Sequence, residues 1–316
     1  MSQDIFVFAP IYFEKVWGGD SFKRILNRKL PNELSGPIGE SWELCDRVEA
    51  VSVDIFSGMT LHELWSQRRE EIFGNHAPNA DRFPILVKLI DASENLSLQV
   101  HPPSHIAAKL FGEPKTEMWY FLHCQPQAII YAGFSEKVSR EKFIESLRSG
   151  SSEVLYHKIK VTQGDAMFLP SGRIHAIGAG NVLLEVQQNS DTTYRVDDWG
   201  RLGLDGKPRE LHIQQALECI DFDDVRPALL KRNGDELVQC EFFTVKQRVL
   251  TEQYEIPGKG QTFVLLFVEK GQIQLAYHRF TVGQTVLISS SSNKRVIQPV
   301  EQPASVVLIS WGIANG

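Results

Sequence analysis

Short runs rich in β-branched and aromatic residues recur along the whole chain, and Gly, Pro, Asn, Asp or Ser separates one run from the next. This pattern is typical of barrels and sandwiches built from short strands. The runs lie at residues 52–56, 83–90, 96–101, 117–122, 127–134, 165–170 and 181–188, and in the last third at 241–250, 262–277, 284–290 and 304–311. The chain is therefore predicted to be mainly β.

Helical periodicity is confined to a few short segments. The first carries Thr60 as a candidate N-cap with Glu63 three residues later, which is the spacing of a capping box. The second has Ser139 as a candidate cap and ends at Gly150, a residue type that commonly stops a helix. We expect these helices to cover a β core. The helical segments lie at residues 60–73, 139–150 and 210–220.

Two segments share a weak internal repeat, residues 161–186 and residues 280–311. Each has a Gly and a polar residue, a strand, a turn of small residues, a second strand and an apolar strand. The first copy carries His175 after its turn, whereas the second has no histidine there. Duplication of a barrel would explain this shared pattern, and so would two unrelated β-hairpins. We predict a metal-binding lobe over 1–229 and a second lobe without metal ligands over 230–316.

Composition and charge narrow the class of protein. The chain is 42% hydrophobic and 23% charged with a formal net charge of -6, which is typical of a globular protein and argues against a nucleic-acid partner. The apolar runs are too short to span a bilayer, and the start lacks the features of a signal peptide. Cysteines without CxxC spacing indicate free thiols and a cytoplasmic location. They are Cys45, Cys124, Cys219 and Cys240.

Candidate metal ligands fall on three of the predicted strands. Because side chains alternate across a strand, Gln99 and His101 point the same way. Glu117 opens the run at 117–122, and His175 follows the turn "PSGR". If each polar face turns inward, two imidazoles and a carboxylate meet, which suits Zn²⁺ or a similar divalent metal. The neutral amide of Gln99 is the weakest of the four candidate ligands.

The same residues also have an ordinary structural explanation. A single histidine near a strand end is more often hydrogen-bonded within the structure than bound to a metal, and Glu117 can be a solvated side chain. A second cluster, "EVQQNSDTTYRVDDWGR" at 185–201, places Glu185 and Gln187 on one face and Arg195 on the next strand. Arg195 suits a phosphate or a developing oxyanion, but an ion pair with a neighbouring Asp explains it as well.

Several of these motifs together resemble the type I mannose-6-phosphate isomerases, in their short bacterial form. The resemblance covers roughly the first 220 residues and rests on motifs that occur in the family's order. It implies a two-lobed cupin protein with one Zn²⁺ per chain, a phosphosugar substrate and an assembly that is a monomer or a homodimer. The motifs are "VWGGDSFKRIL", "IGESWEL", "LSLQVHP", "KTEMWYFL" and "LPSGRIHAIGAGNVLLEVQQNSDTTYRVDDWGR".

Carried over residue by residue, the resemblance implies a metal site and a catalytic set. The zinc ligands would be Gln99, His101, Glu117 and His175. The catalytic residues would be Arg195, Glu185 and Lys115. The chain departs from the family at Pro103, Ser104 and Pro114, where acidic residues or Gly and His are common. These departures affect the shape of a loop and the fit of the substrate rather than the metal.

The implied reaction interconverts mannose 6-phosphate and fructose 6-phosphate through a cis-enediol. A divalent ion would polarise the carbonyl, and Arg195 would stabilise charge or hold the phosphate. Glu185 is the candidate base because burial would raise its pKa, and Lys115 is the alternative. Two other functions stay open: another metal-dependent cupin enzyme, such as an epimerase or a dioxygenase, and a non-catalytic relative that binds sugar phosphates.

Overall fold

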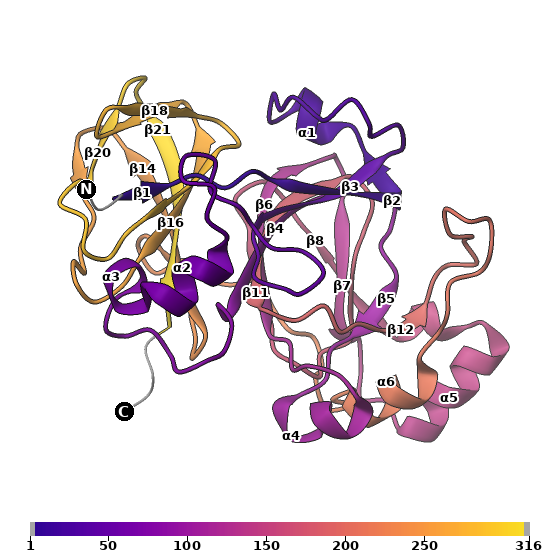
Figure 1. Ribbon diagram of the computed structural model, residues 1–316. Coiled ribbons are helices and arrows are strands. Elements are labelled where there is room, and N and C mark those ends of the chain that lie inside the picture. The colour runs from indigo at the N-terminus through magenta and orange to yellow at the C-terminus, as the bar shows by residue number, and fades with distance from the viewer. Residues whose placement is uncertain (1–3, 313–316) are drawn as a thin grey trace.

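The computed structural model describes residues 4–312 and confirms a mainly β protein with a few short helices. Its strands form four sheets in two lobes (Figure 1). The six-stranded sheet of the first lobe has the order β2 (Ile11–Gly19), β3 (Ile38–Leu44), β4 (Ile85–Ala92), β11 (Asn181–Gln188), β6 (Glu117–Cys124) and β9 (Ala166–Leu169). The five-stranded sheet has the order β12 (Tyr194–Asp197), β5 (Leu98–Val100), β10 (His175–Ile177), β7 (Ile129–Phe134) and β8 (Tyr156–Lys160).

The second lobe contains the other two sheets. Its six-stranded sheet has the order β1 (Ile5–Phe6), β19 (Thr285–Ile288), β16 (Val264–Lys270), β21 (Ala304–Trp311), β14 (Phe243–Leu250) and β13 (Glu236–Gln239). The four-stranded sheet has the order β15 (Tyr254–Glu255), β20 (Val296–Pro299), β17 (Gln272–Leu275) and β18 (His278–Thr281). Within residues 4–312 each lobe is thus a jelly-roll sandwich of two sheets and not a closed barrel.

The inner faces of the two sheets of the first lobe pack against each other. Trp119, Phe121 and Leu183 of the six-stranded sheet share one buried cluster with Ile130 and Ile177 of the five-stranded sheet. Because side chains alternate along a strand, the neighbouring residues of these strands point to the outer face of each sheet. Leu98, Val100, Ala176, Tyr194 and Val196 form a different cluster, on the outer face of the five-stranded sheet, with residues of α5 (Arg140–Ser149) and α6 (Ile213–Cys219). The polar residues between them therefore face the interior of the lobe.

Two of the three predicted helical segments begin at the predicted caps, whereas the segment predicted over 210–220 forms a helix only over α6 (Ile213–Cys219). Thr60 caps α2 (Leu61–Gln67) and forms the predicted capping box with Glu63. Ser139 accepts a hydrogen bond from the backbone N–H of Lys142, and Gly150 ends α5 at a φ of 69°. The predicted helix over 60–73 is wrong in one respect, because Arg68 leaves helical geometry and separates α2 from α3 (Arg69–Phe73). The remaining helical elements are α1 (Ser21–Arg24), α4 (Ser104–Ala107), η1 (Ala108–Leu110) and η2 (Ser152–Leu155).

The outer face of the first six-stranded sheet packs on the second lobe. Val87, Met118 and Leu184 share a buried cluster with Phe267 and Val307 of the second lobe. The chain also crosses between the lobes at its start, because β1 lies in the second lobe (Figure 1), where it pairs antiparallel with β19. The sequence did not predict this pairing. The division of the chain into lobes at 1–229 and 230–316 stays a prediction. β1 does not follow it, because this strand lies within 1–229 but pairs with the second lobe.

Trp65 lies at the centre of this contact between the lobes. Its side chain is fully buried, its ring centroid lies 5.5 Å from that of Phe83 and 5.8 Å from that of Trp311, and its indole N–H donates to the carbonyl of Ala80. Trp65→Ala is expected to lower the free energy of unfolding by about 3–5 kcal/mol, because the cavity removes contacts from both lobes. Chemical denaturation measures this. Phe111→Ala, at a fully exposed ring, is the control, and its expected effect is within about 0.5 kcal/mol.

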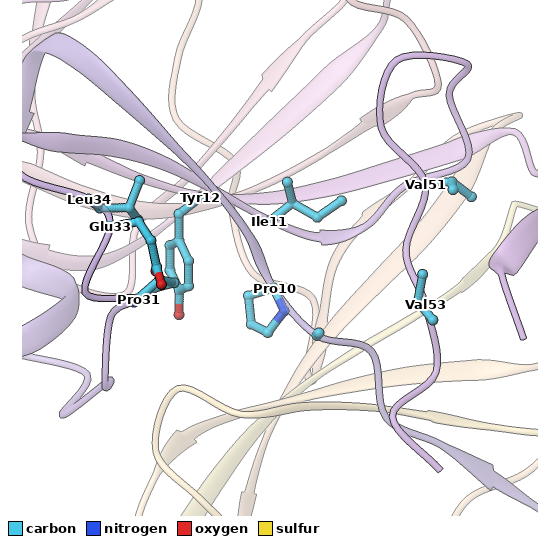
Figure 2. Close-up of a pocket in the computed structure, with 9 residues that line it drawn as sticks. Pro10, Ile11, Tyr12, Pro31, Glu33, Leu34, Val51 and Val53 are labelled. Atoms are coloured by element: carbon cyan, nitrogen blue, oxygen red, sulfur yellow. The ribbon is translucent and has the colours of Figure 1, made fainter. Parts of the chain in front are cut away.

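A shallow cavity of about 310 Å³ opens where β2 begins (Figure 2). Apart from Glu33 its lining is uncharged and largely apolar, and none of the predicted site residues contributes to it. It therefore has few groups that would recognise a charged ligand. Among residues 4–312, no helix is long and apolar enough to cross a membrane.

Candidate metal centre

Two histidines and one glutamate converge between the two sheets of the first lobe. His101 directly follows β5, His175 begins β10, and Glu117 begins β6 of the facing sheet. One potential ligand atom of each lies within 4.8 Å of those of the other two, and no other such group of three is found in the part of the chain described. The three positions are far apart in the sequence, so the packing of the two sheets brings them together.

All three side chains are almost completely shielded from solvent, with exposures of 2% for His101, 0% for Glu117 and 1% for His175. The Nε2 atoms of both imidazoles and Oε1 of Glu117 make no hydrogen bond, and the close contact of Oε2 is the ammonium of Lys115 at 2.9 Å. Buried polar atoms are rarely left in this state, because the loss of hydration costs free energy. An N₂O donor set of this kind fits a divalent metal, which would satisfy these atoms.

The second ring nitrogen of each histidine contacts a backbone carbonyl. Nδ1 of His101 lies 2.9 Å from the oxygen of Thr192, and Nδ1 of His175 lies 2.8 Å from that of Arg173. A neutral ring donates from Nδ1 in this arrangement and keeps a lone pair on Nε2, which is the form that binds metals. Burial, followed by the charge of Lys115, lowers the pKa of His101 to about 3, and burial lowers that of His175.

Lys115 provides the opposite charge to Glu117. Its Nζ lies 2.9 Å from Oε2 of Glu117, and both side chains are buried. Burial by itself opposes ionisation of Glu117, but Lys115 and then His101 hold the pKa of the carboxyl well below its usual range. Burial likewise opposes the charge on Lys115, but Glu117 and Glu185 raise the pKa of its ammonium. Lys115 and Glu117 are therefore both ionised, and the Glu117 carboxylate carries the negative charge that a bound cation requires.

Gln99 and Arg195 lie on the same inner face as His175. The register pairs Gln99 with His175 on one side and with Arg195 on the other, and directly paired residues point to the same face. Arg195 donates from Nη1 to the carbonyl of Glu210, whereas its buried Nε has no partner. Burial, followed by the charge of Arg209, lowers the pKa of Arg195. The guanidinium is thus only partly satisfied by the protein.

Glu185 lies on β11, on the facing sheet. It is 4% exposed, and its Oε2 accepts a hydrogen bond of 2.9 Å from the indole N–H of Trp119. Its Oε1 lies 3.7 Å from Nζ of Lys88 and 4.0 Å from Nζ of Lys115. Burial, and then the charge of Glu117, raise its pKa despite these lysines. A carboxyl with a raised pKa beside a metal site can accept and return a proton.

Sequence reasoning missed two charged residues of this interior. Lys88 is 4% exposed and lies in the middle of β4, and Glu40 lies on β3 with its carboxylate 3.2 Å from Nζ of Lys15. Although burial opposes its ionisation, Lys88 and then Lys15 lower the pKa of Glu40 to about 2. The available signal was a single lysine inside the apolar run "FPILVKLI", where a charge needs a buried partner.

Comparison with known proteins identifies the family of this chain. A family model described as phosphomannose isomerase type I, catalytic domain, matches residues 5–121. A mannose-6-phosphate isomerase of Streptococcus mutans is 37% identical over 293 residues, which are 90% of this chain and 88% of the relative. The chain belongs to the type I phosphomannose isomerase family. The resemblance inferred from the motifs is thereby confirmed.

Solved structures of the family share the fold. The crystal structure of mannose 6-phosphate isomerase from Bacillus subtilis aligns with a TM-score of 0.85 at 28% identity, over 97% of this chain and 99% of the other. A zinc-bound mannose 6-phosphate isomerase aligns with a TM-score of 0.77 at 16% identity, over 98% and 100% of the two chains. The second likeness shows the fold alone. The predicted two-lobed cupin architecture of the family is confirmed.

Proposed function

We propose that this phosphomannose isomerase family member interconverts mannose 6-phosphate and fructose 6-phosphate as a zinc enzyme. The supporting observation is the buried donor set of His101, Glu117 and His175, whose ligand atoms converge within 4.8 Å and whose two imidazole Nε2 atoms make no hydrogen bond. The Streptococcus mutans relative supports the choice of reaction, since it is a mannose-6-phosphate isomerase by name. Gln99 is proposed as the fourth ligand because its register places it beside His175.

Zinc is the proposed metal, at one ion per chain. Two neutral imidazoles and one carboxylate are a donor set that zinc enzymes use, and a structural neighbour is a zinc-bound mannose 6-phosphate isomerase. When bound, the ion would polarise the sugar carbonyl and hold two adjacent oxygens on the same side. The ionised Glu117 and the neutral histidines are already in the protonation states that a cation requires.

Glu185 is the proposed base that carries a proton between C2 and C1 of the open-chain sugar. Its raised pKa favours proton uptake, and its burial excludes competing water. Lys115 is the weaker candidate for this role because its raised pKa keeps it protonated and its Nζ is paired with Glu117. Lys115 is instead proposed as a fixed positive charge beside the metal site.

Arg195 is proposed to stabilise negative charge on the substrate from the facing sheet. Arg195→Ala is expected to lower kcat/KM by about 10²-fold with zinc still bound, because the guanidinium is a charge-stabilising donor and not a ligand. Arg226→Ala, which removes another guanidinium that donates to a backbone carbonyl, is the matched control and should leave both quantities unchanged. Loss of zinc from the Arg195 variant would show that this division of roles is wrong.

The proposed function is tested with protein stripped of metal by EDTA and reloaded with zinc. Fructose 6-phosphate is supplied in an assay coupled to consumption of mannose 6-phosphate, with elemental analysis of the same samples. Turnover that disappears with the metal and returns with zinc supports the proposal. No turnover by the zinc-loaded protein contradicts it and favours a non-catalytic relative. Oxygen uptake by an iron-loaded sample would favour a cupin dioxygenase.

We place this reaction in the cytoplasm. Cys45, Cys124, Cys219 and Cys240 are all free thiols, as the sequence predicted, and unpaired cysteines are typical of a reducing compartment. Burial raises the pKa of each of these thiols, so none is an activated nucleophile. They therefore take no part in the proposed reaction.

A further inference from the structure

Four side chains form one row across neighbouring strands in the six-stranded sheet of the first lobe. The register pairs Trp42 of β3 with Lys88 of β4, Lys88 with Glu185 of β11, and Glu185 with Trp119 of β6. These strands are neighbours in the sheet (Figure 1). Directly paired residues of antiparallel strands point to the same face, so the row lies on the inner face, beside the metal centre. The Glu185 carboxylate is thus flanked by a cation on one side and an indole on the other.

Trp119 contacts both halves of the proposed catalytic apparatus. It is fully buried, its Nε1 donates to Oε2 of Glu185 at 2.9 Å, and its ring meets that of His175 edge-on at 5.4 Å between centroids. The indole has a single donor and no titratable group, so this donor is present at every pH. A buried ring packed on a metal ligand has little freedom to move. Trp119 is therefore a rigid donor to Glu185.

The two oxygens of Glu185 have different surroundings. Oε2 is engaged by Trp119, whereas Oε1 has only Lys88 at 3.7 Å and Lys115 at 4.0 Å, both longer than a hydrogen bond. The indole N–H selects one rotation of the carboxylate and leaves Oε1 as the oxygen available to a substrate proton. A base must be held in a narrow range of positions to be effective.

We propose that Trp119 is a positioning residue that orients Glu185 so that Oε1 is the atom that takes the proton. This inference rests on the proposed function, because it assigns the base of that reaction. Trp119 acts through Glu185 and does not touch the reacting atoms. The competing explanation is that Trp119 only fills the core, since it also shares a buried cluster with Phe121 and Met167.

The test compares Trp119→Phe with Tyr120→Phe. The first substitution keeps a ring in the core and removes the donor to Glu185. The second removes a hydroxyl from the neighbouring residue of the same strand, whose 2.8 Å hydrogen bond runs to Glu269 in the other lobe. Trp119→Phe is expected to lower kcat about tenfold, the effect of one lost hydrogen bond to a charged group, with KM and bound zinc unchanged. Tyr120→Phe is expected to leave kcat unchanged.

A double-mutant cycle separates positioning from packing. In a Glu185→Gln background, Trp119→Phe should cause no further loss of kcat, because the group that it orients is already disabled. An equal loss in both backgrounds would overturn the inference in favour of a packing role. An unchanged kcat in the single variant, or loss of zinc together with activity, would overturn it as well.

The pH profile gives a second readout. An N–H donor stabilises the ionised carboxylate, so Trp119→Phe should move the acid limb of kcat/KM to higher pH. The charged groups that face Glu185 are Lys88 of β4 with Asp191 beside it, Lys115 just before β6, and Glu117 at the start of β6. The substitution leaves all of them in place. An unmoved acid limb contradicts the inference. If the parental protein has no isomerase activity, the proposed function is wrong. If the parent is active and Trp119→Phe has no effect, only the inference about Trp119 is wrong.

Discussion

Glu117→Gln is expected to lower zinc occupancy and isomerase activity together. The substitution removes the only negative charge among the proposed ligands and leaves two neutral histidines and the buried ammonium of Lys115 facing the site. Replacing a residue that only hydrogen-bonds to a metal ligand typically lowers metal affinity about 10–100-fold. Replacing the charged ligand itself should therefore lower zinc affinity at least about 10²-fold. Elemental analysis after dialysis and the isomerase assay with added zinc measure the two effects.

The same substitution also bears on stability in the metal-free protein. Lys115 loses the partner that raises its pKa, and breaking a buried ion pair from one side costs about 3–5 kcal/mol. Thermal unfolding of the metal-free parent and of metal-free Glu117→Gln measures this loss of stability. Glu141→Gln, at an exposed carboxylate of α5, is the control and should retain metal, activity and stability. A Glu117→Gln protein that keeps its zinc would show that the ion is bound elsewhere.

Glu185→Gln is expected to lower kcat by about 10²–10⁴-fold, the range for loss of a general base, with zinc still bound. Gln has nearly the shape of Glu and still accepts the indole N–H of Trp119, so the inner face should remain packed. Retention of zinc distinguishes this variant from Glu117→Gln. Parental kcat in a zinc-loaded Glu185→Gln protein would exclude Glu185 as the base.

The pH dependence of the parent follows from the same residue. The reaction requires Glu185 as a carboxylate, and its pKa in the folded protein is raised by burial and by Glu117. Activity should therefore be present above that raised pKa and fall as the pH drops through it, at a higher pH than an exposed glutamate would give. The residual activity of Glu185→Gln should lack this acid limb. An acid limb of unchanged position in the variant would mean that another group titrates.

Local sequence signals predicted the elements and their faces. The capping pair Thr60 and Glu63 and the stop at Gly150 depend on residues within one helical turn, and the structure confirms them. Alternation along "LSLQVH" predicted that Gln99 faces away from Leu98 and Val100, and these two residues lie in the outer core of the five-stranded sheet. Such signals succeed because they involve neighbours in the sequence.

The alternation and motifs of the sequence by themselves determined a mainly β fold, the faces of its strands and the candidate residues of a metal site. Only the tertiary structure decided that His101, Glu117 and His175 share one space, that β1 joins the other lobe, and that Lys88 and Trp119 flank Glu185. Strand register and the packing of one sheet on another are set by contacts between distant segments. A local pattern of residues does not contain the distances between those segments.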